Sequence, residues 1–460
     1  MTQALQEENR LFYSKMFKIG VPVLVQQMIS VGLNLADTIM VGRLSDDALA
    51  AVGAANQIYF IFSVLIFGVL SGAAVYTVQF WGIRDLKSLR KILGIDYMVC
   101  AVLSVVTMAL AYVAAPQLIG LFVSGSEVIE LGTKYLRIAV FSYGFATFSF
   151  SIIFNSRAIM QLKIPTIINA VAILINIILN YCLIYGKMGM PQLGVEGAAY
   201  ATLTARILEC AAMFIAVYAQ KEHPLRAGLK ELASFDFKLF TDVMKKAIPV
   251  MVNESAWALS MSLMNIAYGK ISDSAFAIMQ IAITIMDFFQ TAYIGVGNAS
   301  AVIVGESLGQ GRKNAAYRNS ERVMKVTFVI NILLTVLLIS SRGIIADIYN
   351  FEPEVSELLK TSLFVYSLSI FPRAYAYMIV CGILRSGGDT LFCMYVETGF
   401  NMLMQVPLAF FGVLVLNWSL PAVVILVSIP DFIKAGVCIA RYRGRKWLNT
   451  VTDMEEVLDD

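Results

Sequence analysis

Long apolar runs recur along the whole 460-residue chain. Examples lie at residues 98–115, 167–185 and 326–340. As helices, runs of roughly 20 residues are long enough to cross the hydrocarbon core of a membrane, which is about 30 Å thick. Charged residues make up only 15% of the chain, whereas they make up about 25% of a soluble domain. The sequence therefore predicts an all-α polytopic membrane protein and excludes an ordinary soluble one.

The apolar runs between charged or Gly/Pro-containing breaks predict about twelve transmembrane helices. These spans are centred near residues 27, 66, 105, 145, 175, 207, 256, 290, 331, 370, 404 and 428. The most polar segment between two spans lies midway along the chain. Leu and Phe recur in it at helical spacing, which predicts an interfacial amphipathic helix. The predicted parts are an N-terminal six-helix bundle (1–219), a cytoplasmic amphipathic linker (220–240), a C-terminal six-helix bundle (241–446) and a cytoplasmic tail (447–460).

Basic residues are concentrated in every second loop. The richest clusters lie at residues 84–91, 221–246, 312–325 and 441–446. Loops on the cytoplasmic side of membrane proteins carry the excess of Lys and Arg. We therefore expect a multi-pass protein of the plasma (inner) membrane, with both termini and the central linker in the cytoplasm.

The two halves of the chain repeat each other at an offset of 227 residues. Pro22 matches Pro249, and Gly82 matches Gly309. Because each half has an even number of predicted spans, both halves enter the membrane in the same sense. This predicts a pseudo-two-fold axis along the membrane normal, the parallel-repeat arrangement of secondary transporters, with the substrate path between the halves.

Several classes of chemistry are excluded. His223 is the only histidine, and the six cysteines are scattered without a CxxC pair, which predicts free thiols. No GxxxxGK[ST] phosphate-binding loop occurs, so we expect neither ATP hydrolysis nor another enzymatic activity, and no cofactor. The formal net charge of +3 is small and its basic residues lie between spans, so nucleic acid is not an expected partner.

Both halves contain short motifs: Pro22, ADTIMVG at residues 36–42, Asn176 and Asn180, and GILRSGGDT at residues 382–390. In this order, the motifs resemble those of the multidrug and toxic compound extrusion (MATE) family. The resemblance covers about residues 17–438. It implies twelve helices in two bundles that face a central cleft, and drug efflux driven by sodium or protons. Relatives with a cation site in the C-terminal bundle often carry a carboxylate in the tenth helix, where this chain has Arg373 instead.

Three polar residues predict a site for the coupling cation, Na⁺ or H⁺. Asp37 lies about five residues, or about 8 Å, inside the outer end of the first span. Asn176 and Asn180, four residues apart, share one face of the fifth span, and Asn180 lies at a similar depth. A carboxylate with amide oxygens suits Na⁺, and a desolvated carboxylate also suits a proton. The alternative is a polar network that only ties the helices together.

A second group of residues predicts the substrate cleft. Glu254 lies near mid-membrane, and its repeat partner is the neutral Gln27. Asp287 lies at comparable depth, so both carboxylates are expected to attract cationic substrates; a structural salt bridge to Arg373 is the alternative. Met and aromatic side chains in the spans predict an adaptable wall for the substrate cleft. We expect Trp257, Met261 and Tyr293 to be part of this wall. The other charged residues within spans, Glu397, Arg206, Glu209, Asp431 and Lys434, are expected to snorkel or to pair locally.

The resulting hypothesis is a cation-coupled antiporter that exports small organic compounds, often cationic, by alternating access. Its expected partners are these substrates and the lipid bilayer, and we expect it to function as a monomer. A flippase for a lipid-linked headgroup is one rival, although an anionic headgroup calls for a basic cleft. A channel or a non-transporting membrane protein is the other.

Overall fold

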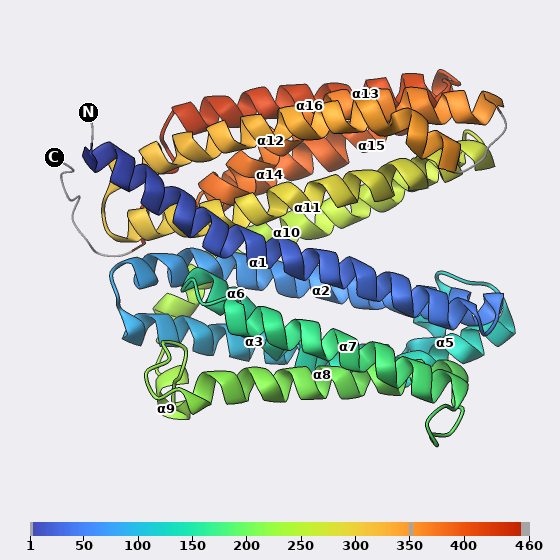
Figure 1. Cartoon of the computed structure of the whole chain (residues 1–460), viewed down its shortest axis with the longest axis horizontal. Coiled ribbons are helices and arrows are strands. Elements are labelled where there is room, and N and C mark those ends of the chain that lie inside the picture. Colours follow the sequence, from blue (N-terminus) through green and yellow to red (C-terminus); the bar gives the residue numbers. More distant parts are fainter. Residues whose placement is uncertain (1–2, 349–352, 452–460) are drawn as a thin grey trace. The chain divides into compact units, whose positions relative to one another are not determined.

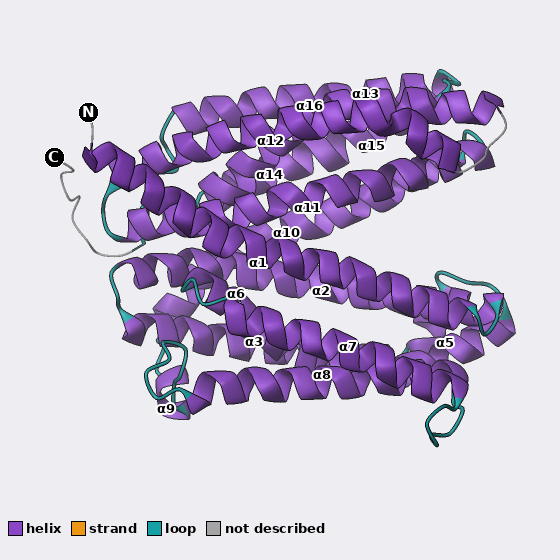
Figure 2. Cartoon of the chain, in the orientation of Figure 1, coloured by secondary structure: helices purple, strands orange, loops and turns teal. Residues whose placement is uncertain are grey.

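The computed structural model describes residues 3–348 and 353–451, and the regular secondary structure of these residues is helical (Figures 1 and 2). The helices are α1 (Gln3–Gly42), α2 (Asp46–Gly82), α3 (Leu86–Val113), α4 (Ala115–Gly120), α5 (Ser126–Ala139), α6 (Ser142–Ala158), α7 (Lys163–Tyr185), α8 (Gly194–Ala219), α9 (Leu229–Leu232), α10 (Phe237–Gly269), α11 (Asp273–Gly309), α12 (Lys313–Ile348), α13 (Pro353–Tyr377), α14 (Thr390–Phe400), α15 (Val406–Phe410) and α16 (Leu420–Arg443). Short π and 3₁₀ segments continue α13 to α15: η1 (Met378–Leu384), η2 (Arg385–Gly387), η3 (Asn401–Gln405) and η4 (Phe411–Val415).

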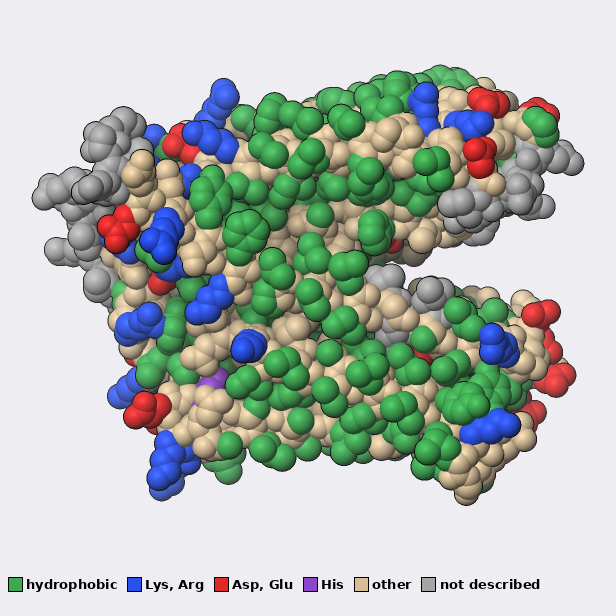
Figure 3. Space-filling model, in the orientation of Figure 1, with side chains coloured by type: hydrophobic (Ala, Val, Ile, Leu, Met, Phe, Trp, Pro, Cys, Tyr) green, Lys and Arg blue, Asp and Glu red, His purple; other side chains and the backbone are tan. Residues whose placement is uncertain are grey.

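Many of these helices suit a membrane. Within the described residues, nine are long and apolar enough to cross one, or ten if α5 and α6, which meet at a 50° bend, form one span. Neither α1 nor α10, which are 40 and 33 residues long, is in that set. Every predicted span centre falls inside a helix. On the face drawn in Figure 3, hydrophobic side chains cover the middle of the helices and charged ones lie near the helix ends.

Two compact units make up the chain. Unit 1 consists of residues 1–21, 78–83 and 246–460, and unit 2 consists of residues 22–77 and 84–245. Residues 1–21 and 78–83 group with the C-terminal half in unit 1, and residues 220–245 group with the N-terminal half in unit 2. The boundary within α1 falls at Pro22, a residue that interrupts the helical hydrogen-bond ladder and favours a bend.

The predicted amphipathic helix over residues 220–240 is wrong. Residues 220–228 form an irregular segment, and only the four-residue α9 is helical before α10 begins. Pro224 lies in this segment and Gly228 precedes α9, and both residues disfavour a helix interior. Leu225 is buried whereas Leu229 is exposed, so the apolar residues do not share one face. Burial lowers the pKa of the nearby His223, whose Nδ1 accepts a hydrogen bond from the Leu225 backbone N–H at 3.2 Å.

In unit 2, α7 and α8 pack closely along their length. Gly186 ends α7 in the left-handed conformation, with φ of 65°, which favours glycine. At the start of α8, a Cβ on Gly197 would overlap the backbone of Leu183. The absence of a side chain there lets the two helices approach, and this approach brings the polar faces of α7 and α8 together.

In unit 1, the two glycines predicted to be repeat partners each lie against the backbone of the other's helix. A Cβ on Gly82, at the end of α2, would lie 2.6 Å from the Glu306 backbone oxygen. Conversely, a Cβ on Gly309, at the end of α11, would overlap the Gln79 backbone oxygen. The side chain of Gln310 also donates a 3.1 Å hydrogen bond to the Gly82 carbonyl. This crossing therefore requires glycine on both helices.

Candidate functional site

A hydrogen bond joins two of the predicted cation-site residues across unit 2. Asn180 on α7 donates from Nδ2 to Oδ1 of Asp37 on α1 at 2.6 Å. Asn180 is 1% exposed, and Asp37 is partly buried. At the same end of α1, the Tyr185 hydroxyl donates a 2.7 Å hydrogen bond to the Met40 carbonyl. These contacts hold the C-terminal half of α1 against α7.

The third predicted residue continues the same polar face. Asn180 Nδ2 also donates to Asn176 Oδ1 at 3.2 Å, and Asn176 Nδ2 lies 3.5 Å from Thr202 Oγ1 on α8. The Asn180 Oδ1 atom is buried and has no hydrogen-bond partner in the described part of the chain. A buried carbonyl oxygen without a partner loses about 1–3 kcal/mol relative to a satisfied one. The structure therefore brings all three residues together and leaves one amide oxygen available to a ligand.

Behind this face lies a buried ion pair. Arg206 on α8 donates to Glu209 at 2.6 Å, and Asn169 on α7 donates to the other carboxylate oxygen at 2.7 Å. These contacts show that Glu209 is locally paired, one of the two predicted alternatives. It is only 1% exposed, so it does not snorkel.

The donor set around Asp37 fits a monovalent cation. It offers a carboxylate and amide oxygens, the hard ligands that alkali and alkaline-earth cations prefer. Removal of a carboxylate from water costs several kcal/mol unless a counter-charge or a proton neutralises it. Within the described residues, no group of three or more His, Cys, Asp or Glu side chains is arranged to hold a metal ion. The site therefore suits an exchangeable Na⁺ or proton better than a tightly held transition metal.

In unit 1, Glu254 has a different partner from the one weighed in the sequence analysis. Arg385, on η2, donates to Glu254 on α10 at 2.6 Å, and the two side chains are 5% and 18% exposed. Arg373 instead pairs with Asp431 at 2.6 Å. The suggested salt bridge from Arg373 to Glu254 or Asp287 is therefore wrong, because Asp431 on α16 occupies Arg373 and Arg385 occupies Glu254.

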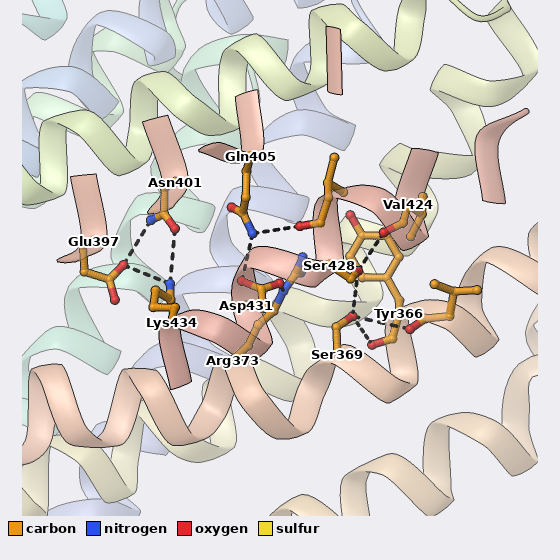
Figure 4. A network of polar contacts seen from close by, with 12 residues as sticks. Tyr366, Ser369, Arg373, Glu397, Asn401, Gln405, Val424, Ser428, Asp431 and Lys434 are labelled. Carbon is orange, nitrogen blue, oxygen red and sulfur yellow. Dashed lines mark hydrogen bonds and ion pairs between the residues drawn. The ribbon is translucent and has the colours of Figure 1, made fainter. Parts of the chain in front are cut away.

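The other charged residues of unit 1 form a polar network between α14–η3 and α16 (Figure 4). Lys434 binds Glu397 at 3.3 Å and Asn401 at 3.2 Å. Gln405 donates to Asp431 at 2.8 Å and to the Val427 carbonyl at 3.1 Å. The π-helical segment η3 begins at Asn401 and ends at Gln405, and such segments are frequent at functional positions. Local pairing of these residues is confirmed, and their burial excludes snorkelling for Asp431 and Lys434.

The remaining predicted cleft residues have varied surroundings. Tyr293 is buried, and its ring lies 5.9 Å from that of Tyr377. Gln27, Trp257 and Met261 are half-buried. Asp287 on α11 is exposed, with no Lys or Arg within ion-pair distance among the described side chains. Gln27 belongs to unit 2 and the others to unit 1, so a cleft that they share stays a prediction.

One buried carboxylate escaped the sequence analysis. Asp96 on α3 is 1% exposed and accepts a 2.8 Å hydrogen bond from Asn155 on α6. It precedes the apolar run at residues 98–115, so it resembled an interfacial residue at the edge of a span. An Asp followed by an uninterrupted apolar run, without a Lys or Arg on the same helical face, was the available signal.

Comparisons with known proteins agree on one family. The model of the family described as MatE matches residues 22–182 and 249–411. The chain is 22% identical over 408 residues to a probable multidrug resistance protein NorM of Thermotoga maritima, covering 88% of this chain and 86% of that protein. It is 26% identical over 435 residues to a probable NorM of Bradyrhizobium diazoefficiens, covering 93% and 92%. A crystal structure of a MATE protein in its bent conformation aligns with a TM-score of 0.87 at 18% identity, covering 97% and 98%.

Proposed function

Because the chain belongs to the MatE family of membrane transporters, which are not enzymes, we propose that it exports small organic compounds in exchange for a cation. The hydrogen bond from Asn180 to Asp37 carries the proposal. It places a carboxylate and an unpartnered amide oxygen together inside a helical unit. The names of its relatives, which describe probable multidrug resistance proteins, support a broad range of small-molecule substrates.

The coupling cation binds at Asp37, with Asn176 and Asn180 as further ligands if it is Na⁺. A cation that neutralises Asp37 removes the cost of a bare carboxylate in an apolar surrounding. The site therefore has different stabilities with and without its cation, and a difference of this kind is what allows an ion gradient to bias a conformational equilibrium. This argument holds for Na⁺ and for H⁺.

The transport path follows from the internal repeat. Twelve spans in two bundles, related by a pseudo-two-fold axis along the membrane normal, alternate between outward-open and inward-open states. The termini lie in the cytoplasm, the membrane is the plasma (inner) membrane, and one chain suffices for transport. Pro22 lies where α1 passes from one compact unit to the other, so a bend there lets its two segments move separately.

Asp287 carries the attraction for cationic substrates. Glu254 is neutralised by Arg385, so its field on a substrate is small. The carboxylate of Asp287 is exposed and has no such partner among the described side chains. Trp257, Met261 and Tyr293 lie in the same compact unit and supply apolar and aromatic surface to substrates.

Transport into inside-out proteoliposomes tests this function. Purified protein is reconstituted, an organic cation such as ethidium is added outside, and Na⁺ or H⁺ gradients directed out of the vesicles, with the higher concentration in the lumen, are imposed separately. Accumulation above the external concentration under one gradient supports antiport and identifies the ion. Equilibration without accumulation under either gradient would favour a channel, and transport of a lipid-linked headgroup alone would favour a flippase.

A further inference from the structure

Unit 2 contains a second buried carboxylate that lacks a compensating charge. Among the side chains that the structure describes, four carboxylates are less than 9% exposed: Asp96, Glu209, Glu306 and Asp431. The last three each lie 2.6 Å from a Lys or Arg nitrogen. Asp96 has no basic side chain within ion-pair distance, so nothing described in the structure neutralises it.

The contacts of Asp96 are few and neutral. Its Oδ2 accepts a hydrogen bond from Asn155 Nδ2 at 2.8 Å, and Asn155 Oδ1 accepts one from Thr77 on α2 at 3.1 Å. The other oxygen, Asp96 Oδ1, is fully buried without a hydrogen-bond partner. The Ser151 and Ser156 hydroxyl groups of α6, on either side of Asn155, are also buried without partners. Asp96 therefore has one neutral hydrogen-bond donor and one buried oxygen without a partner in the described structure.

Charged groups on the neighbouring helices are engaged elsewhere. On α3 itself, Tyr97 and Cys100 are the titratable residues nearest to Asp96 in the chain. On α6, the Arg157 guanidinium lies 4.6 Å from the centre of the Phe154 ring. On α9, Glu231 pairs with Arg90, beside Lys230. On α5, Glu130 pairs with Lys134, and Arg137 lies over Tyr112, near the far end of α3.

From this geometry we propose that Asp96 is a proton-binding site, distinct from the Asp37–Asn180 site. A bare carboxylate with one unpaired oxygen in an apolar interior costs several kcal/mol, and a proton on Oδ1 removes that charge. A sodium ion fits less well, because Asn155 presents its amide nitrogen to the carboxylate and its oxygen to Thr77. The ligand is therefore the proton itself.

The position of Asp96 gives this site a separate route for proton exchange. Asp96 is ten residues, about 15 Å, beyond the start of α3, and Thr77 is about 8 Å before the end of α2. Both helix ends adjoin the basic loop predicted to be cytoplasmic. Asp37 lies near the opposite end of α2, about 8 Å before the end of α1. Proton binding at Asp96 stands on this geometry alone, and its use in transport rests on the proposed cation coupling.

Infrared spectroscopy of the full-length protein in lipid tests the proposal without a transport assay. A protonated carboxyl group has a C=O stretching band that shifts on deuteration. We expect wild-type protein at neutral pH to show such a band, Asp96→Asn to lose it, and Asp37→Asn to retain it. Asn155→Leu keeps the carboxyl group and removes its donor, so the band should move in frequency. This second variant remains informative if Asp96→Asn does not fold.

Two results would overturn the proposal. The first is a carboxyl band that is absent from wild-type protein from mildly acidic to neutral pH, or that is the same in folded Asp96→Asn protein. The second is loss of the Asp96 band on addition of NaCl but not of choline chloride, which would assign the site to sodium. Failure of the coupling proposal would appear instead as absent gradient-driven export with the Asp96 band intact.

Discussion

Asn180 on α7 donates a 2.6 Å hydrogen bond to the carboxylate of Asp37 on α1, and the same nitrogen reaches Asn176 at 3.2 Å. The three residues thus form one chain of polar contacts that ends at a partly buried carboxylate. The neighbouring oxygen, Asn180 Oδ1, has no partner in the described structure. This arrangement supplies a carboxylate charge that a cation can neutralise and an amide oxygen that can coordinate the same cation.

Asn180→Ala separates sodium coupling from proton coupling. With Na⁺ as the coupling ion, loss of an oxygen ligand should raise the Na⁺ concentration for half-maximal export about tenfold, the effect of about 1.4 kcal/mol. With H⁺, the same variant should change proton-driven export only modestly, because the carboxyl group remains. Asn169→Ala is the matched control, because Asn169 is also on α7 but its side chain contacts Glu209 on α8 and not Asp37. An unchanged Na⁺ requirement in a sodium-driven protein would exclude Asn180 as a ligand.

Glu254 and Arg385 should behave as a structural pair. Removal of one member of a buried ion pair typically costs about 3–5 kcal/mol, because the other charge stays buried. We expect Glu254→Gln and Arg385→Gln each to lower the melting temperature of the purified protein. The double variant should lower it by less than the sum of the two single losses. Additive losses in this cycle would show that the 2.6 Å contact is not energetically coupled.

Asp287→Asn should discriminate between substrates by charge. Loss of the exposed carboxylate removes attraction for organic cations and leaves apolar contacts intact. We expect the concentration for half-maximal export to rise several-fold for a cationic dye and to change little for a neutral compound of similar size. Equal effects on both substrates, in protein of unchanged thermal stability, would remove Asp287 from substrate recognition.

Gly309→Ala should destabilise unit 1. The added methyl group would overlap the Gln79 backbone, which cannot rotate away, and overpacking of this kind costs about 1–3 kcal/mol. Gly436→Ala on α16 is the control, since nothing lies within 4 Å of its Cβ position. That variant should be neutral or slightly stabilising, because alanine favours the helix. Equal melting temperatures for the two variants would contradict the close crossing of α2 and α11.

Much of the fold could be predicted from sequence because a membrane imposes one long apolar run per span. All twelve span centres fall inside helices, and membership of the family is confirmed. The prediction of an amphipathic helix in the linker was wrong because it used the apolar spacing alone and ignored Pro224 and Gly228. It also missed that Leu225 is buried by tertiary packing.

The candidate site was only partly predictable. The pairing of Asp37 with Asn180 followed from helix depth, since both were counted from helix ends. The partner of Glu254 could not be predicted in this way. Arg385 lies on a short 3₁₀ segment after a π-helical turn, and that turn changes which side chains share a face. Asp96 was missed because it lies at the edge of an apolar run, and the one available signal, the lack of a Lys or Arg on its helical face, does not by itself show burial.

Gradient-driven export by Asp37→Asn tests the central claim most directly. The substitution is nearly isosteric and cannot ionise, so the protein should insert, fold and bind substrate. In proteoliposomes with imposed Na⁺ or H⁺ gradients, we predict that wild-type protein accumulates substrate against its gradient and that Asp37→Asn only equilibrates it or does not transport it. Uphill export at the wild-type rate by well-folded Asp37→Asn protein would contradict the assignment of coupling to Asp37.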